Sequence, residues 1–224
     1  MRERPILFSA PMVRAILEGR KTQTRRVVKL PKWAGANCIE VNERDMPLVV
    51  AEATGCLAEM PFPYGQPGDR LWVREAFADL LNTGIEHRPT PESPIQRFAY
   101  AADTPPGSYG DECRKDYGIK WQPSIHMPRW ASRILLEVTA IRVERLQDIS
   151  EADAQAEGAY ADAACNGMFT TDGNTYTTKQ DGAAGAYAEL WERLHGDDAW
   201  AANPWVWVVE FKKLGAGETA GVTP

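Results

Sequence analysis

Two stretches of alternating hydrophobic residues constrain the fold of this chain most strongly. In the first stretch every second residue is hydrophobic, at Ile134, Leu136, Val138 and Ala140. The hydrophobic phase then moves to Ile141 and Val143, a one-residue slip that predicts a β-bulge near Ala140. A bulge bends a strand, so this stretch predicts a long strand in a curved sheet.

The second stretch lies close to the end of the chain. Hydrophobic residues alternate there at Trp205, Trp207, Val209 and Phe211, and valines fill positions 206 and 208 between them. Side chains on a strand point alternately to its two faces. The pattern predicts a closing strand that is buried on at least one face.

Shorter signals complete the expected order of elements. Strands are expected at residues 6–8, 22–28, 70–76 and 97–100, and helices at 11–17, 151–158 and 182–194. Gly19 is expected to end the first helix, Ser150 to cap the second and Asp181 to cap the third. Many strands with few short helices predict an α+β fold, a small curved β-barrel with flanking helices.

Length and composition favour one domain with long loops. The chain has 224 residues, 44% of them hydrophobic, and its 18 Gly and 16 Pro are spread along the whole length. A single domain is expected over residues 1–214, with a flexible tail at 215–224. Turn-rich insertions are expected near residues 31–66, 81–96, 104–120 and 159–180.

The sequence contains no pattern for a membrane span, a disulfide framework or a metal site. No run of about 18 hydrophobic residues occurs, so a cytoplasmic protein without membrane contact is expected. The four cysteines, Cys38, Cys56, Cys113 and Cys165, are isolated and have no nearby pair of histidines. We therefore expect no zinc site, no metal and no cofactor.

The charge pattern gives two opposing indications about a polyanionic partner. The net charge of −6 opposes nonspecific binding to a phosphate backbone. Between Glu18 and Glu40, however, the chain has no acidic residue but six basic ones: Arg20, Lys21, Arg25, Arg26, Lys29 and Lys32. The segment from Gly19 to Arg26 is therefore predicted to form the floor of a ligand site.

With these elements placed, the chain resembles the ASCH family, a branch of the PUA-like barrels. Four blocks in family order carry the resemblance over about half of the chain: residues 19–26 (GRKTQTRR), 67–73 (PGDRLWV), 146–150 (LQDIS) and 207–212 (WVVEFK). The longer layout, with insertions between these blocks, is similar to that of ASCH-like proteins from phages and prophages.

This resemblance implies a PUA-like fold and a function related to RNA or nucleosides. Some small bacterial members of the family are amidohydrolases that remove the acetyl group from N4-acetylcytidine with a Lys, a Thr and a Glu. Carried onto this sequence, the Lys and Thr of the motif fall on Lys21 and Thr24, and the Glu falls on Glu157.

These three residue types suit amide hydrolysis. Thr24 would attack the amide carbonyl, and Lys21 would take the hydroxyl proton. The ordinary pKa of lysine, about 10.4, must be lowered for that role, which burial and the charges of neighbouring arginines at 20, 25 and 26 would achieve. Glu157 would lie at the negative end of a helix dipole, which favours a protonated carboxyl that can donate to the departing amine.

Further polar and aromatic residues are expected to line the substrate pocket: Arg20, Arg26, Trp72, Glu75, Ser124 and Trp130. Glu75 is an alternative to Glu157 as the acid. For Trp130 the alternative is a residue that plugs the barrel.

Three functions remain open from the sequence. The first is an amidohydrolase acting on an N4-acylated cytosine nucleoside, a small-molecule substrate. The second is a module that binds RNA or a modified nucleobase without turnover, and the third is a ribonuclease in which His126 serves as base. The oligomeric state stays open.

Overall fold

The fold centres on one mixed sheet. The computed structural model describes residues 2–29, 62–88 and 92–215, together with the backbone of residues 39–41, 47–50 and 57–59. Its five-stranded sheet has the spatial order β1-β6-β9-β13-β2, and only the β1–β6 pair is parallel. The strands are β1 (Glu3–Leu7), β2 (Gln23–Val27), β6 (Arg70–Arg74), β9 (Leu135–Arg145) and β13 (Trp205–Lys213). The fold class is therefore α+β, as expected.

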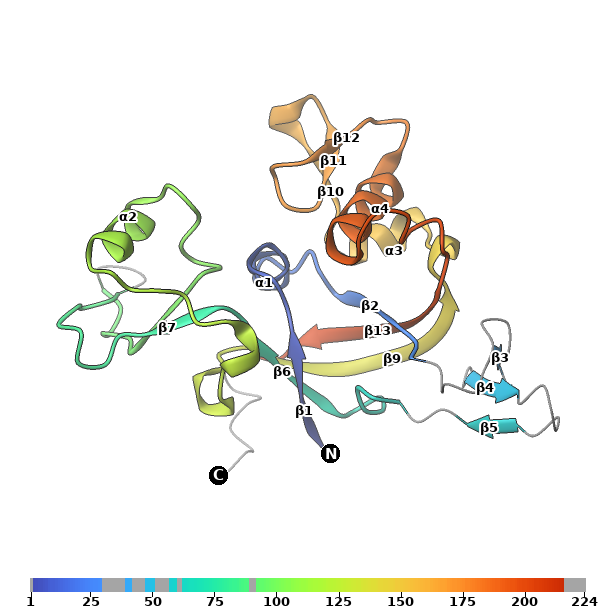
Figure 1. Cartoon of the computed structure of the whole chain (residues 1–224), viewed down its shortest axis with the longest axis horizontal. Helices are drawn as coiled ribbons and strands as arrows, with labels where there is room; N and C mark the ends of the chain where they lie inside the picture. The colour runs from blue at the N-terminus through green and yellow to red at the C-terminus, as the bar shows by residue number, and fades with distance from the viewer. Residues whose placement is uncertain are drawn as a thin grey trace.

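The bulge predicted near Ala140 is confirmed by the pairing of β9 with β13. These two long strands curve side by side in Figure 1. Glu210 pairs with Ala140, but the next residue of β13, Phe211, pairs with Val138. Thr139 is thus the extra residue, and it allows both Val138 and Val143 to reach the same hydrophobic core.

The closing strand β13 is buried on both of its faces. Trp207 and Val209 belong to one core cluster, which includes Val13 and Ile16 of helix α1 (Ala10–Leu17). Val206 and Val208 belong to a second cluster, with helices α3 (Glu151–Ala156) and α4 (Gly182–His195). The alternation of the sequence thus places two hydrophobic cores on opposite faces of one sheet, while a third, smaller cluster lies around Phe77, Tyr100 and Met127.

The ladders of the described residues do not close the sheet into a barrel. β1 and β2 are the two edges of the sheet. One side chain connects them, because Arg26 of β2 donates from Nη2 to the carbonyl of Leu7 at 2.7 Å. The curved sheet is established, whereas the PUA-like barrel expected from the resemblance is not.

The helix ends follow two of the three sequence signals. Gly19 has φ +77° directly after α1, and the Ser150 hydroxyl accepts from the Asp153 amide at the start of α3. Asp181 occupies the N-cap position of α4 as predicted, but its side chain makes no capping hydrogen bond. The carboxylate of Glu151 instead accepts from the amides of Ala183 and Ala184 at 2.7 and 3.2 Å.

Two of the expected loops contain regular structure. The segment 104–120 includes helix α2 (Tyr109–Asp116), which Ser108 caps. The segment 159–180 forms a three-stranded antiparallel sheet with β10 (Tyr160–Asp162), β11 (Met168–Thr170) and β12 (Tyr176–Thr177). The loop predictions for both segments are therefore wrong in detail.

The remaining elements are short. The segment 81–96 connects the hairpin strands β7 (Phe77–Asp79) and β8 (Phe98–Tyr100). Part of the segment 31–66 forms an antiparallel sheet of β3 (Ile39–Val41), β4 (Pro47–Val50) and β5 (Leu57–Glu59). The part of the chain that the structure describes also has four 3₁₀ turns: η1 (Ser124–His126), η2 (Arg129–Ala131), η3 (Leu146–Asp148) and η4 (Ala163–Cys165).

Some expectations fall outside the described residues. They include Lys32, Cys38, Cys56 and the predicted tail from residue 216 onward. Among the helices that are described, none has the length and hydrophobicity needed to cross a membrane.

A glycine at position 158 lets α1 approach the end of α3 closely. Gly158 has φ +106°, and a Cβ there would lie 3.3 Å from the Cβ of Ala15. Gly118 also has a positive φ, +66°, but a Cβ there would meet no atom within 4 Å.

We expect Gly118→Ala to lower the free energy of unfolding by about 1 kcal/mol through backbone strain alone. Gly158→Ala adds the clash with α1 and should lower it by about 2–4 kcal/mol. Urea denaturation of the two variants tests this, and equal losses would show that the close approach at Gly158 has no energetic weight.

Candidate functional site

Residues 20–22 bind the last carbonyl groups of α3 in register. The Thr22 amide donates to Ala156 O at 2.8 Å, Lys21 Nζ to Glu157 O at 2.9 Å and Arg20 Nη1 to Gly158 O at 3.0 Å. Carbonyls at the end of a helix have no partner within the helix, and cations there complement its dipole. The basic motif thus has a structural task in addition to any chemical one.

Lys21 and Glu157 form a buried ion pair. Lys21 Nζ lies 2.6 Å from Glu157 Oε2, and the two side chains are only 1% and 2% exposed. Lys21 Nζ also donates to Gln23 O at 2.8 Å. Together with the bond to Glu157 O, all three protons of the ammonium group are in use. The structure therefore joins two of the three predicted catalytic residues directly.

The environment of Lys21 lowers its pKa from the ordinary value. Burial is the largest cause, and the charges of Arg26 and Arg25 act in the same direction, whereas Glu157 opposes them. The expected depression by burial is confirmed. Arg20 does not contribute as expected, because it turns outward to pair with Glu18 at 2.5 Å.

Arg25 belongs to the predicted floor segment 19–26, although no catalytic or lining role was predicted for it. Its side chain has no exposed surface, and its guanidinium lies 2.5 Å from Glu144, 3.3 Å from Glu157 and 3.7 Å from Asp153. The two oxygens of Glu157 are thus divided between Lys21 and Arg25. Strand alternation could have indicated this, because Arg25 pairs with Val208, whose side chain faces α3 and α4.

The outer carboxylates continue the cluster toward the surface. Arg142 contacts Glu144 at 3.0 Å and Asp153 at 2.8 Å, and it also binds Glu210. Positive and negative groups therefore alternate from the buried Lys21 to the exposed side of β9. The alternation gives each buried charge at least one opposite neighbour.

Thr24 lies on the floor of a small pocket at the free edge of β2. Its side chain is buried, and no hydrogen bond joins its hydroxyl to Lys21 Nζ, whose three donors are used elsewhere. The pocket is lined by Met12, Thr24, Arg25, Arg26, Glu157, Tyr187, Leu190, Trp191, Leu194 and His195. Its volume of about 10 Å³ is the space for roughly one water molecule.

The wall of this pocket comes from α4, whose role the sequence did not reveal. Tyr187 and Trp191 are core residues on one face of α4, yet both also line the pocket. His195 ends the helix and lies against the Trp191 ring at a centroid distance of 4.2 Å. Aromatic residues on one face of a helix can pack in the core and line a pocket at the same time, so their spacing alone does not indicate a site.

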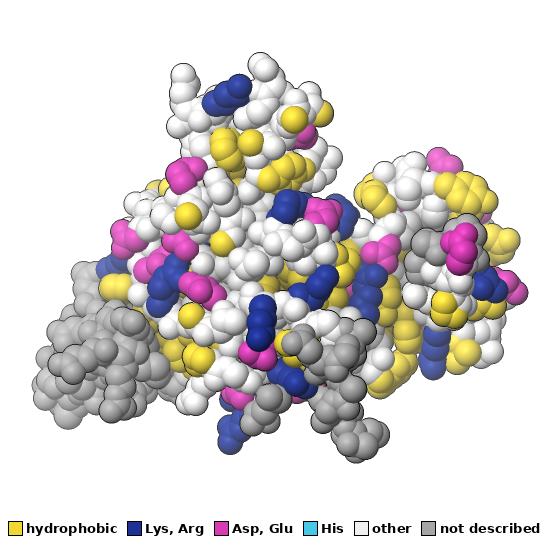
Figure 2. Space-filling view, turned by 180° about the vertical axis from the view of Figure 1, so that it is seen from behind, with side chains coloured by type: hydrophobic (Ala, Val, Ile, Leu, Met, Phe, Trp, Pro, Cys, Tyr) yellow, Lys and Arg dark blue, Asp and Glu magenta, His cyan; other side chains and the backbone are white. Residues whose placement is uncertain are grey.

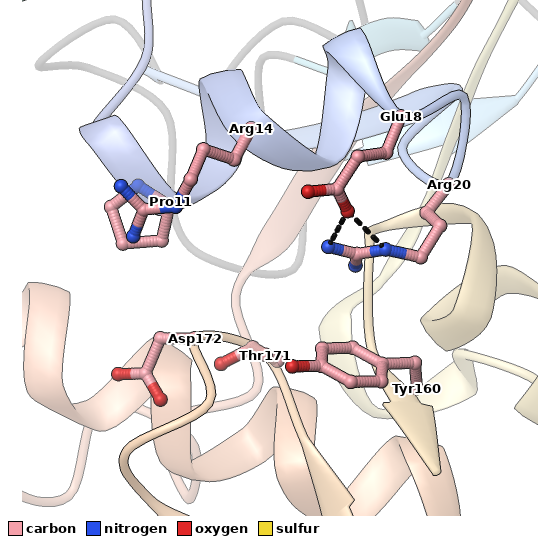
Figure 3. A pocket seen from close by; sticks show the side chains of 7 residues that line it. All are labelled: Pro11, Arg14, Glu18, Arg20, Tyr160, Thr171 and Asp172. Carbon is pink, nitrogen blue, oxygen red and sulfur yellow. Dashed lines mark hydrogen bonds and ion pairs between the residues drawn. The ribbon is translucent and has the colours of Figure 1, made fainter. Parts of the chain in front are cut away.

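Arg20 and Arg26 lie on different sides of the ion pair. Arg26 lines the pocket and bonds Leu7 O, as described above. Arg20 lines a separate cleft of about 190 Å³ between α1 and the β10–β12 sheet, where it lies over the Tyr160 ring at 4.4 Å (Figure 3). In Figure 3 the Nε and Nη2 atoms of Arg20, on the side of the guanidinium that faces α1, both donate to the Glu18 carboxylate.

The other predicted lining residues have contacts of their own. Glu75 is buried against Arg133 at 2.9 Å, and burial raises the pKa of its carboxyl. Trp72 stacks on Arg74, which bonds the Ile125 carbonyl beside Ser124. No hydrogen bond or ion pair in the described parts of the chain links Glu75, Trp72 or Ser124 to Lys21 or Glu157.

Trp130 does not plug the sheet. It is 63% exposed and packs on Phe98 at 5.2 Å and on the Arg97 guanidinium at 4.9 Å. His126, also exposed, lies in η1. In the described ranges, no group of three or more His, Cys, Asp or Glu side chains could hold a metal ion, and Cys113 and Cys165 are free thiols.

The two ion pairs of the motif differ in burial and allow a matched test. Replacing Glu157 by Gln leaves the Lys21 ammonium buried without a carboxylate, so we expect the free energy of unfolding to fall by about 3–5 kcal/mol. Glu18→Gln breaks the exposed pair with Arg20 and should cost less than about 1 kcal/mol.

Urea denaturation of both variants measures the difference. A double variant, Lys21→Met with Glu157→Leu, should recover most of the loss, because it removes both buried charges together. Similar small losses in all three variants would contradict a buried, energetically coupled pair.

Comparison with known proteins identifies no relative: no protein-family model, curated protein or solved structure matches the chain. Proposals about its function therefore rest on the geometry of this site and on the resemblance of its motifs.

Proposed function

We propose that this protein is an amidohydrolase that removes the acyl group from an N4-acylated cytosine nucleoside, on a PUA-like fold of the ASCH type. One observation carries the proposal. Glu157 and Thr24 line a single pocket, and Lys21, which does not line it, is held by its buried ion pair with Glu157. These are the residues that the resemblance designates as base, acid and nucleophile.

The close contact within the pair suits both proton transfers of amide hydrolysis. Movement of one proton across the 2.6 Å contact converts ammonium and carboxylate into a neutral amine and a carboxylic acid. The low polarity of a buried site favours this neutral form more than water does. Lys21 then takes the proton of Thr24 as its Oγ bonds to the acyl carbon, and Glu157 protonates the amine nitrogen as the C–N bond breaks.

The products of this first step are an acyl ester on Thr24 and the free cytosine amine. Lys21 and Glu157 have regained their charged forms. Water then attacks the ester and gives one proton to a base at the pocket. As the bond from the acyl carbon to Thr24 Oγ breaks, Oγ takes a proton from Lys21, and the carboxylic acid returns that proton to Lys21 as it leaves as the anion. Arg25 holds Glu157 throughout, because it binds the second carboxylate oxygen at 3.3 Å.

The curvature of the sheet supports the PUA-like fold as part of the proposal. The bulge at Thr139 bends β9, and the bond from Arg26 to Leu7 O brings the two edge strands together. Two aromatic residues, Tyr187 and Trp191, line the pocket and would contact a planar base once side chains at its rim move aside.

RNA binding through the basic stretch has less support from the structure. Arg20, Lys21 and Arg25 are each paired with carboxylates, so their charges are neutralised within the protein. Figure 2 shows acidic and basic side chains interspersed over the face it presents. A phosphate backbone would have to compete with these internal ion pairs.

The direct test mixes the purified protein with N4-acetylcytidine and follows the formation of cytidine by absorbance. We expect Lys21→Met and Thr24→Val to lower kcat/KM by about a thousandfold each, because each removes one reacting group. Glu189→Gln, on the exposed side of α4, is the control and should keep full activity.

Two results would reject the proposal. One is no turnover at high enzyme concentration. The other is full activity in the folded Thr24→Val protein. A gel-shift series with short RNAs at two salt concentrations runs alongside, and tight binding without turnover would favour the binding module instead.

The small volume of the pocket implies that a nucleoside enters by displacing side chains at its rim. Leu194 lines the pocket and is 51% exposed, so its side chain can turn out into solvent and open the pocket. We expect Leu194→Ala to lower KM by at least about threefold with little change in kcat, because the pocket would be open in a larger fraction of the molecules.

Leu81→Ala is the matched control, since Leu81 is 55% exposed and does not line the pocket. Initial-rate kinetics of both variants measure the effect. A higher KM in Leu194→Ala would show that Leu194 binds the substrate and does not obstruct it.

A further inference from the structure

The buried ion pair has no direct route for exchanging protons with solvent. Lys21 uses its three donors on Gln23 O, Glu157 O and Glu157 Oε2. On the far side of Glu157 lies the Arg25 guanidinium, which does not give up its proton in proteins. The carboxylates of Glu144 and Asp153 beyond Arg25 are therefore insulated from the pair. Protons released during hydrolysis must leave through the pocket above Thr24.

His195 is the group on that pocket suited to carry them near neutral pH. The other titratable or charged groups that face it are Arg25 and Arg26 from β2, Glu157 from the end of α3 and Tyr187 from α4. The arginines stay charged, burial holds the pKa of Tyr187 well above its usual range, and Glu157 is bound by two cations. An imidazole, in contrast, gains and loses a proton in this pH range.

The position of His195 is fixed on one side and open on the other. Its ring lies against Trp191 at 4.2 Å, with an angle of 35° between the ring planes, and the residue as a whole is exposed. Burial of part of the ring and the nearby charge of Arg26 hold the pKa of His195 below its usual range. At neutral pH the imidazole is thus uncharged and can accept a proton.

We propose that His195 is the base that activates water for release of the acyl group from Thr24, and that it passes the proton to solvent. This inference rests on the proposed function. One water fits in the pocket that Thr24 and His195 share. A proton of that water goes to the imidazole as its oxygen bonds to the acyl carbon.

The rest of the step balances through the ion pair. The bond from the acyl carbon to Thr24 Oγ breaks, and Oγ takes a proton from Lys21. The carboxylic acid product returns a proton to Lys21 as it leaves as the anion. The imidazolium of His195 releases its proton to bulk solvent, so one proton appears for each amide hydrolysed.

The test separates the two chemical steps in full-length His195→Gln. Rapid mixing with N4-acetylcytidine should give a burst of cytidine, as in the wild type, followed by turnover slowed about a hundredfold. Intact-mass spectrometry should then show one acetyl group on the chain, at Thr24. Glu189→Gln again serves as the control, with wild-type rates and no accumulated ester.

Two further measurements test whether His195 acts by accepting a proton. Below the pKa of His195 the imidazole is charged and cannot accept a proton, so wild-type kcat should fall on the acid side and that fall should vanish in His195→Gln. Added imidazole should restore part of the turnover of His195→Ala.

The outcomes distinguish the inference from the proposed function. Equal turnover and equal pH profiles in wild type and His195→Gln would overturn the inference alone, as would a slowed burst without accumulated ester. Absence of both burst and turnover in the wild type would overturn the proposed function and the inference with it.

Discussion

The docking of residues 20–22 onto the end of α3 is the interaction on which the rest of the site depends. Three consecutive carbonyls, from Ala156 to Gly158, receive donors from Thr22, Lys21 and Arg20 in reverse order. This register places the Lys21 amine against the Glu157 carboxylate and leads the chain directly into β2. This docking requires two glycines: the positive φ of Gly19 ends α1, and the missing side chain of Gly158 leaves room for Ala15 and Lys21. Secondary-structure capping and the candidate chemistry therefore use the same contacts.

Burying this ion pair imposes conditions on its surroundings. A lysine and a glutamate removed from water lose hydration that one mutual contact does not fully replace. Arg25 supplies Glu157 with a second partner, and Glu144 and Asp153 compensate Arg25 in turn. Arg142 closes the cluster at the surface, where water completes the solvation. The charges of β2, β9 and α3 are consequently linked through Arg25 and Arg142.

The sequence predicted those parts of the fold that depend on local chemistry. The phase slip at Ala140, Gly19 after α1 and the Ser150 cap each have a short-range physical cause, and each is confirmed. The motif resemblance assigned Lys21 and Glu157 to one site, but their direct ion pair was not predicted. What could not be predicted depends on contacts across long separations. Glu151 caps a helix more than 30 residues further along the chain, and Arg25 is buried only because α3 and α4 cover that face of β2. His195 gave no signal, since a histidine at a helix end has many ordinary explanations.

The capping of α4 by Glu151 has a consequence for how the 159–180 segment can vary. The helix spans Gly182–His195, about 20 Å, with Glu151 at one end and the pocket residues Trp191 and His195 toward the other. Because Glu151 belongs to α3, the start of α4 is held by the helix whose C-cap is Glu157. The connecting segment holds α4 as well, through the Arg193–Asp172 ion pair and the packing of Phe169 in the same core cluster. A change in β10–β12 that spares these two contacts therefore leaves the pocket wall in place, whereas a change that removes them leaves α4 anchored mainly from its start.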